Sequence, residues 1–246
     1  MKTGPDQGQS AASLNANVSY FLNNIQQYQE SVSTIDTYRR ISAFISQKLS
    51  GVGELMDIGN GGVFDYDTSL VTSITAVDVF FDDLTPDLLH KYFPANVRAC
   101  QGSALAIPEP EGQFDMALMV MLLHHLAGGD WLTSWHNAQR AIDEAWRVLR
   151  PTGRLLIVES CVPWWFFQIE KPSFLILSKL VGSVLSHPIT FQFPVEMIAD
   201  HLRRRSQHVT TQQIAKGKYV LQFGFKFPSI FTPIQIWGIE AYKPER

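Results

Sequence analysis

Glycines and a carboxylate follow an apolar run near residue 57, in a pattern suited to binding a ligand. Because glycine has no side chain, the segment Asp57-Ile58-Gly59-Asn60-Gly61-Gly62 lets the chain turn sharply and lets a ligand approach the backbone closely. The helix expected after it would offer free N–H groups to an anion. The spacing departs from G-x-G-x-x-G, since Phe64 occupies the last position, so the pattern disfavours a dinucleotide site.

A second carboxylate, Asp78, ends the next apolar run, 21 residues after Asp57. It can accept both hydrogen bonds of a ribose diol, and it would repel a 2′-phosphate. Gly102, Ser103 and Ala104 follow a further run and could line an adenine pocket with main-chain groups. Together these segments indicate a site for a ribose and an adenine ring.

Two adjacent histidines, His124 and His125, are suited to proton transfer. On a helix they would point about 100° apart, so they cannot both bind one metal ion in the usual i, i+4 manner. At most one of them therefore faces the site, and we expect no metal centre. For His125, a structural role at the start of a helix and a catalytic role are equally consistent with the sequence.

The elements that position these residues alternate along the chain. We expect strands at Leu55 to Gly59, Ile74 to Asp78, Val97 to Cys100, Phe114 to Val120 and Arg154 to Glu159. The clearest helices are expected at Ser134 to Leu149 and Pro194 to Arg204. Such alternation predicts βαβ units and a parallel sheet covered on both faces. Ligands bind such sheets at the carboxyl ends of the strands, where the segments described above would converge.

Composition excludes several classes of protein. Of the 246 residues, 46% are hydrophobic and 17% are charged, which suits a packed core and not a disordered chain. The net charge of −3 is too weak to attract nucleic acid. The two cysteines, Cys100 and Cys161, cannot form a disulfide framework or a thiolate metal site, and they indicate reduced thiols in a cytoplasmic protein.

The most apolar stretch of the chain, Val162 to Leu185, is long enough to cross a bilayer. It contains Gln168, Glu170, Lys171 and Lys179, and such groups are costly in hydrocarbon. We therefore expect no stable membrane insertion.

Five segments occur in a specific order: Asp57 to Gly62, Asp78, Gly102 to Asp115, Leu123 to Leu126, and Ala145 to Glu159. The last contains the most specific run, Arg-Val-Leu-Arg-Pro-Thr-Gly-Arg-Leu-Leu-Ile. In this order they resemble the class I S-adenosylmethionine-dependent methyltransferases, in the small-molecule branch that includes quinone-biosynthesis enzymes. The resemblance covers about residues 53–160. It implies a Rossmann-like, doubly wound α/β sheet, mostly parallel with an antiparallel last strand, together with N-terminal helices and an aromatic-rich helical cap.

The same resemblance implies S-adenosylmethionine as the cofactor. Gly59 and Gly61 would pass beneath its methionine part. Asp57 would lie near its amino group, and Asp78 would hold the ribose hydroxyls.

The remaining cofactor and acceptor positions also follow from the resemblance. Val79 would pack on the adenine, and Ser103 and Ala104 would border it. Met121 and Leu122 would face the sulfonium and the acceptor. The resemblance thus implies a methyltransferase that acts on an O, N or C nucleophile.

Methyl transfer from a sulfonium needs no metal, because it is an in-line displacement in which the protein mainly holds the reactants together. An acidic nucleophile such as a phenol or an enolisable carbon also needs a base, for which His124 and His125 are the candidates. An amine nucleophile would need none.

Aromatic residues gather outside the resembling core. Trp164 and Trp165 belong to such a cluster, and Tyr20 could join it from the N-terminal helices. An aromatic stripe often belongs to a hydrophobic core, yet the walls of small-molecule sites are mostly apolar. We therefore expect these residues, with Leu122, to bind a small hydrophobic or aromatic acceptor.

We expect one methyltransferase domain at residues 16–246 behind a flexible polar tail at 1–15. Within it, residues 16–50 would form cap helices, 53–160 the cofactor-binding core, 161–207 a substrate cap and 208–246 the C-terminal strands. A homodimer is compatible with this reading. The alternative is a non-catalytic partner or binding protein with a degenerate cofactor site, because Val63 replaces the family's third glycine and Ser103 replaces a commoner aspartate.

Overall fold

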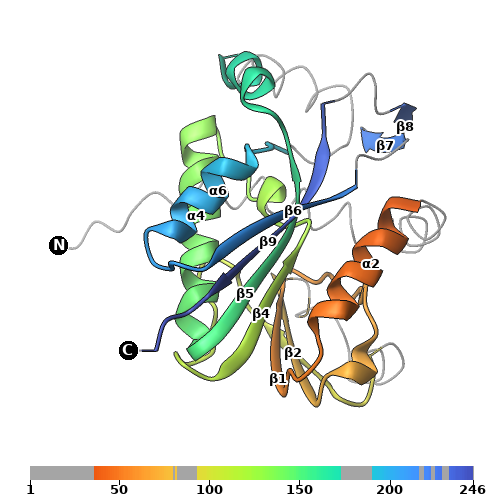
Figure 1. Ribbon diagram of the computed structural model, residues 1–246, viewed down its shortest axis with the longest axis vertical. Helices are drawn as coiled ribbons and strands as arrows, with labels where there is room; N and C mark the ends of the chain where they lie inside the picture. The colour runs from red at the N-terminus through yellow and green to blue at the C-terminus, as the bar shows by residue number, and fades with distance from the viewer. Residues whose placement is uncertain are drawn as a thin grey trace.

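The computed structural model describes residues 36–79, 81, 93–172, 190–215, 219–222, 225–228 and 233–245. Its centre is a seven-stranded sheet in the order β3-β2-β1-β4-β5-β9-β6 (Figure 1). The strands are β1 (Glu54–Ile58), β2 (Ser73–Asp78), β3 (Val97–Gln101), β4 (Phe114–Val120), β5 (Leu149–Cys161), β6 (Val209–Ala215) and β9 (Gln235–Tyr242). Neighbouring strands from β3 to β5 pair in parallel, whereas β9 is antiparallel to both of its neighbours. The predicted α/β sheet, mostly parallel with an antiparallel last strand, is confirmed.

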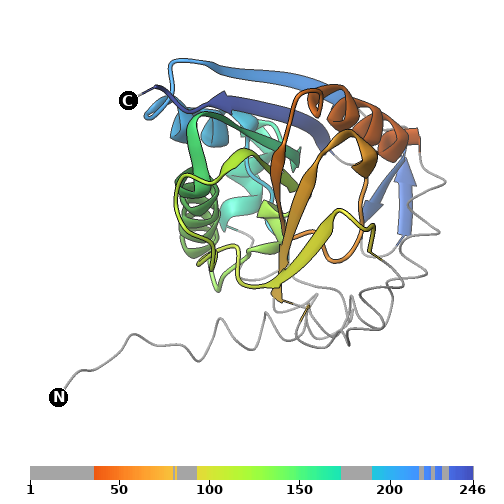
Figure 2. The ribbon, with the colours of Figure 1, turned by 90° about the horizontal axis from the view of Figure 1, so that it is seen from below.

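Helices cover both faces of this sheet, as expected for a doubly wound fold. Helices α4 (Trp131–Val148) and α6 (Val195–Arg203) pack on one face, and α2 (Asp36–Lys48) packs on the other. Figures 1 and 2 show α2 across the sheet from α4. Two hydrophobic clusters result, one on each side, and they fix the central strands between the helix layers.

The α2 helix lies very close to the antiparallel strand β9. Ile41, Phe44 and Ile45 recur at helical spacing and are buried against the sheet. A side chain at Gly238 of β9 would place its Cβ 2.5 Å from the Phe44 ring. Glycine at this position therefore lets the helix approach the strand.

The strand order reverses between β1 and β4. These two strands are neighbours in the sheet, although β2 and β3 lie on the far side of β1. Ligands of open α/β sheets bind in the crevice outside the carboxyl ends of the strands at such a reversal. The loops that follow β1, β2 and β4 meet there.

Several element boundaries differ from the sequence-based expectation. Helix α4 begins at Trp131 and not at Ser134, because the Asp130 side chain accepts a hydrogen bond of 2.7 Å from the Thr133 N–H and caps the helix earlier. Strand β5 extends beyond the predicted range at both ends, from Leu149 to Cys161. Helix α6 begins after Pro194, one residue later than expected.

The segment after β1 contains no regular α-helix, which corrects the expectation of a helix N-terminus behind the glycines. A single 3₁₀ turn, η1 (Thr68–Leu70), lies between β1 and β2, and the Asp67 side chain caps it by accepting from the Ser69 N–H. Residues 65–72 are rich in Asp, Ser, Thr and Val, which are poor helix formers. The glycine loop is therefore held by side chains and not by a helix.

The remaining described elements lie towards the C-terminal half. A helix at residues 164–172 lies beyond the carboxyl end of β5 (Figure 1). Strands β7 (Tyr219–Gln222) and β8 (Phe225–Pro228) form a separate two-stranded hairpin. Of the helices in the described ranges, none combines the length and the apolar character required to cross a bilayer. Residues 1–35, with Tyr20, lie outside the described residues.

Candidate functional site

The loop after β1 follows a path that requires glycine. Gly59, Gly61 and Gly62 have φ angles of 72°, 61° and 81°, in the left-handed region that side chains disfavour. A Cβ on Gly59 would lie 2.4 Å from Leu122 Cδ1, so this glycine lets the loop after β4 pack directly on it. A Cβ on Gly61 would meet no described atom within 4 Å. The backbone at Gly61 therefore presents an open surface to a ligand.

Asp78 joins this loop to the neighbouring strand ends. It is the last residue of β2, and its buried carboxylate accepts a hydrogen bond of 2.7 Å from the Gly61 N–H. Its backbone carbonyl accepts from the Gly102 N–H at 3.1 Å. The structure thus brings together three of the segments that the sequence predicts for the site, and Val79 follows directly in the chain.

Asp57 fixes the shape of the glycine loop through hydrogen bonds to two side chains of that loop and the segment after it. One oxygen of its buried carboxylate accepts hydrogen bonds from Asn60 Nδ2 and from the Tyr66 hydroxyl, both at 2.7 Å. Asn60 Nδ2 also donates to the Val63 carbonyl at 2.6 Å. Burial raises the pKa of Asp57 to about 7, against the lowering effect of the hydrogen bonds from Tyr66 and Asn60.

Sequence reasoning missed the part played by Tyr66 and gave Asn60 no role. Tyr66 contacts Asp57 across nine residues of irregular loop, and no periodic pattern reports such a contact. The feature that could have pointed to Tyr66 is its hydroxyl, because a tyrosine hydroxyl needs a hydrogen-bond partner when the ring is buried.

The loop after β4 carries strain at its first residue. Met121 has a φ angle of 52°, and its N–H donates to the Val158 carbonyl at 2.7 Å. A non-glycine residue in this region costs energy and often occurs at functional sites. The next residue, Leu122, lies on Gly59, so the structure places the predicted acceptor-side residue against the glycine loop.

The two histidines lie in a short 3₁₀ turn, η3 (Leu123–His125). Their ring centroids are 4.1 Å apart with 39° between the planes, so the rings lie side by side instead of pointing well apart as expected for a helix. Nδ1 of His124, which is buried, lies 2.5 Å from Glu159 Oε1 at the end of β5. Sequence reasoning placed Glu159 at the end of a strand and gave it no role.

The loop after β3 is anchored to helix α4. Glu144 accepts from the Ile107 N–H at 2.9 Å, and Arg147 donates to the carbonyls of Ile107 and Glu109, both at 2.9 Å. Arg147 also pairs with Glu144, and this ion pair lowers the pKa of the Glu144 carboxyl. These contacts fix the predicted adenine side of the site.

Ser103 and Ala104 begin this anchored loop. The Ser103 hydroxyl accepts from the Leu105 N–H at 3.1 Å, and the Ala104 side chain is buried. The serine thus shapes the turn through its own backbone neighbours.

The aromatic cluster divides between the core and the surface. Phe167, Phe191 and Phe193 are buried, and the Phe191 ring packs edge to face against each of the other two. Trp164 and Trp165 lie on the helix at residues 164–172, with 44% and 62% of their surfaces exposed. Much of the described part of the aromatic stripe is therefore core, whereas the two tryptophans reach the surface.

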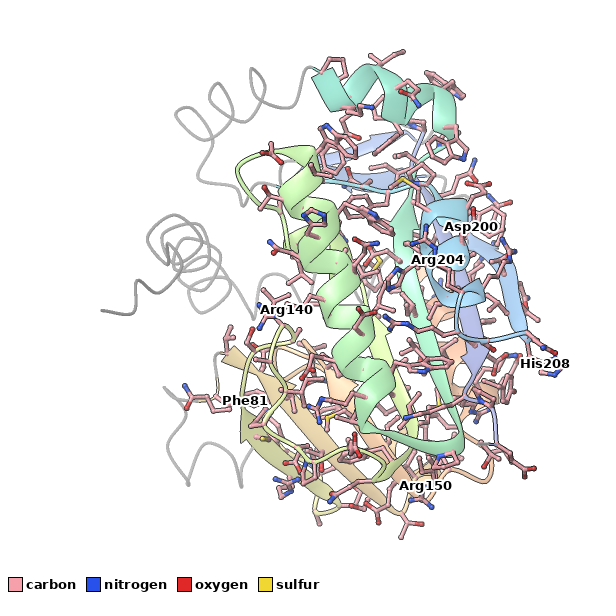
Figure 3. All side chains as sticks on the ribbon, turned by 90° about the vertical axis from the view of Figure 1, so that its left-hand side faces the viewer. Phe81, Arg140, Arg150, Asp200, Arg204 and His208 are labelled. Atoms are coloured by element: carbon pink, nitrogen blue, oxygen red, sulfur yellow. The ribbon has the colours of Figure 1, made fainter. Side chains whose placement is uncertain are left out.

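Three arginines at residues 203–205 lie at the C-terminal end of helix α6, whose last residue is Arg203. Arg203 pairs with Asp200 at 2.7 Å, and Arg205 pairs with Asp143 of α4. Figure 3 labels Asp200 on α6 and Arg204 directly after the end of the helix. Two of these charges are used in ion pairs, which suits a solvated helix face.

The comparisons with known proteins agree with this geometry. Residues 56–157 match the model of a methyltransferase domain. An uncharacterized methyltransferase-like protein of Schizosaccharomyces pombe is 36% identical over 113 residues, which are 44% of this chain and 36% of that protein. A ubiquinone/menaquinone biosynthesis C-methyltransferase of Serratia proteamaculans is 27% identical over 146 residues, 54% of each chain. The alignments thus span about a third to about a half of the length of these curated relatives.

A solved structure supports the fold over nearly the whole chain. The 1,6-didemethyltoxoflavin-N1-methyltransferase of Burkholderia thailandensis, with bound 1,6-didemethyltoxoflavin and S-adenosylhomocysteine, superposes with a TM-score of 0.61. It is 16% identical and covers 98% of this chain and 93% of its own. Residues 56–157 therefore form a methyltransferase domain, and the chain has the fold of a solved methyltransferase that binds S-adenosylhomocysteine.

Proposed function

We propose that this protein moves the methyl group of S-adenosylmethionine to an O, N or C nucleophile of a small apolar or aromatic metabolite. The observation that carries the proposal is the hydrogen bond of 2.7 Å between the Asp78 carboxylate and the Gly61 N–H. It places a carboxylate able to accept from a ribose diol beside a backbone position with open space above it.

The residues present fit the cofactor. In this proposal Asp78 holds the ribose hydroxyls, and Gly59 and Gly61 lie beneath the methionine part. Asp57 supports the loop and lies towards the amino group, which as a cation favours the ionised form of a nearby carboxyl. Met121 faces the sulfonium.

The adenine would lie on the side of the site that helix α4 anchors. Val79 packs on the ring in this proposal, and Ser103 and Ala104 border it. The hydrogen bonds that Glu144 accepts from the Ile107 N–H and that Arg147 donates to the Ile107 carbonyl support this assignment, because they hold the loop in place. A pocket wall that is fixed before binding loses less entropy when the ligand arrives.

The chemistry of the bound cofactor is the supply of an electrophilic methyl on a sulfonium. The protein's residues hold the acceptor in line with it, and proximity of this kind can supply about 7–11 kcal/mol of the barrier. For an acidic acceptor, His124 and His125 are the candidate bases, because they follow β4 directly at the same edge of the sheet.

An apolar acceptor is supported by the residues at this edge. Leu122 lies on the glycine loop, and the exposed Trp164 and Trp165 lie on the helix beyond β5. Tyr20 remains part of the proposal from sequence alone. The names of two similar proteins refer to ubiquinone/menaquinone biosynthesis and to 1,6-didemethyltoxoflavin, which favours a small molecule over a macromolecule.

The organisation of the whole chain belongs to the same proposal. It treats residues 16–246 as one domain, with 16–50 and 161–207 covering the acceptor and 208–246 completing the sheet. A cytoplasmic location and a homodimer remain predictions, and gel filtration with light scattering tests the second.

The experiment is a transfer assay with S-adenosylmethionine carrying a labelled methyl group. Panels of hydrophobic phenols, amines and enolisable ketones are screened by mass spectrometry for a gain of one methylene. We expect at least one compound to be methylated, and Asp78→Ala to abolish the product while the circular dichroism spectrum is kept. Binding of the cofactor without any methylated product across all three classes would contradict the proposed reaction.

A further inference from the structure

A buried carboxylate near the end of β5, that of Glu159, makes hydrogen bonds with the loop that carries the histidines. Glu159 is 1% exposed. It accepts from the Leu123 N–H at 2.6 Å, from the Ser160 N–H at 2.7 Å and from the Ser160 hydroxyl at 3.2 Å, and His124 Nδ1 lies 2.5 Å from it. A buried charge is tolerated when it is paired and fully hydrogen-bonded, and this one is.

These donors determine the chemical state of the pair. Backbone N–H groups can only donate, and they contact both oxygens of Glu159, so both oxygens act as acceptors. The arrangement favours the tautomer in which His124 Nδ1 carries a proton and donates it to Glu159 Oε1. In the neutral ring this leaves Nε2 as the nitrogen with the free electron pair.

The position of the pair connects it to the site. His124 lies in the same loop as Met121 and Leu122, and Leu122 lies on Gly59. The His124 carbonyl accepts from the Phe191 N–H at 3.0 Å, which ties the loop to the segment that precedes α6. The ring of His124 is therefore held by Glu159 and its backbone by Phe191, at the edge of the sheet where the cofactor loop lies.

We infer that His124 is the general base of the transfer reaction, with Glu159 as the residue that positions it, and that the acceptor carries an acidic O–H or C–H. This inference rests on the proposed function. Nε2 of His124 takes the proton of the acceptor, and the electron pair left on the acceptor atom forms the bond to the methyl carbon. The pair of the broken S–C bond stays on sulfur, which leaves as neutral S-adenosylhomocysteine, and the imidazolium returns its proton to water.

The environment distinguishes His124 from its neighbour. The ionised Glu159 stabilises the imidazolium that forms on His124, as a charge-assisted hydrogen bond does. His125 is stacked 4.1 Å away, and two positive rings at that distance would repel each other. Among the described residues, Glu159 and His125 are the titratable groups against the His124 ring, and together they favour at most one positive charge on this pair of rings.

The state of the ring can be measured without any acceptor. Long-range ¹⁵N–¹H spectra of the histidine-labelled protein, loaded with S-adenosylhomocysteine at neutral pH, report which nitrogen of His124 is protonated. We expect the Nδ1–H form. The Nε2–H form would overturn the inference, because Nε2 could not then accept a proton.

A near-isosteric variant separates catalysis from structure. In His124→Asn the side-chain amide nitrogen replaces Nδ1 and keeps the hydrogen bond to Glu159, while Nε2 is lost. With the phenol turned over fastest in the transfer screen, we expect kcat to fall about a hundredfold or more and KM to change little. The acidic limb of the pH profile should disappear. His208→Asn is the matched control, because the His208 side chain is exposed near β6, away from this edge (Figure 3).

Two kinetic results would contradict the assignment. Near-normal kcat in His124→Asn would show that the ring acts only through its hydrogen bond to Glu159. Loss of the acidic limb in His125→Asn instead of His124→Asn would give the proton transfer to the neighbour. In Glu159→Gln, we expect kcat to fall while KM changes little, since the imidazole loses its charge-assisted hydrogen bond. Methylation of the same phenol by the wild type, with retained binding of S-adenosylhomocysteine in each variant, separates a failure of this inference from a failure of the proposed function.

Discussion

The open space above Gly61 gives a direct test of the cofactor loop. Gly61 has a φ angle of 61°, and an added Cβ would meet no described atom within 4 Å. Alanine at this position therefore strains the backbone without a clash inside the protein. If a ligand occupies that space, the new methyl group obstructs it.

Gly112 provides the matched control. It has a φ angle of 74°, and a Cβ there would likewise meet no described atom within 4 Å, but it precedes β4 at the opposite edge of the sheet. A left-handed non-glycine residue costs about 1–2 kcal/mol. In a domain of this size that lowers the melting temperature by about 2–8 °C, so Gly61→Ala and Gly112→Ala should be destabilised alike.

Binding should separate the two variants. A methyl group forced into an occupied, well-packed contact costs about 1–3 kcal/mol, which is about 5- to 150-fold in Kd. We expect that loss of affinity for S-adenosylhomocysteine in Gly61→Ala and no change in Gly112→Ala, measured by titration calorimetry beside thermal melts. Equal Kd values for the two variants would refute the placement of the ligand over Gly61.

Two further predictions concern stability. Burial raises the pKa of Asp57 to about 7 from 3.8, so the stability that the protonated carboxyl contributes is lost as the pH rises through about 7. Denaturant titrations should show the wild type losing more stability between about pH 5 and about pH 8 than Asp57→Asn does. Thr152 has a φ angle of 63°, so Thr152→Gly should stabilise the protein by about 1 kcal/mol, or about 2–4 °C in a thermal melt. Parallel pH profiles for Asp57→Asn, or a lower melting temperature for Thr152→Gly, would contradict these two explanations.

The sheet could be read from the sequence because its strands are buried on both faces. Such strands give continuous apolar runs, and the range of β4 is the one predicted, Phe114–Val120. The carboxylate that ends β2 and the glycines after β1 mark the site for a similar reason, since both are unusual directly after an apolar run. Asp78 and Gly61 indeed lie in contact.

Contacts between distant residues could not be read in this way. His124 and Glu159 are 35 positions apart, and Tyr66 reaches Asp57 across an irregular loop. Neither contact follows from local period or propensity, because each depends on how the strands are ordered in the sheet. The helix expected after the glycine loop is absent for a local reason, because the Asp, Ser and Thr residues there do not favour a helix.

The most direct test of the cofactor site is the calorimetric binding of S-adenosylmethionine and S-adenosylhomocysteine to the purified chain and to two variants of Asp78. Asp78→Ala removes both acceptor oxygens, whereas Asp78→Asn keeps one carbonyl oxygen for the Gly61 N–H. Hydrogen bonds to a charged group contribute about 1.5–3 kcal/mol, so we expect binding of both ligands to the wild type, weakened about tenfold or more in each variant. Binding that is absent from the wild type, or equally strong in all three proteins, would contradict the account.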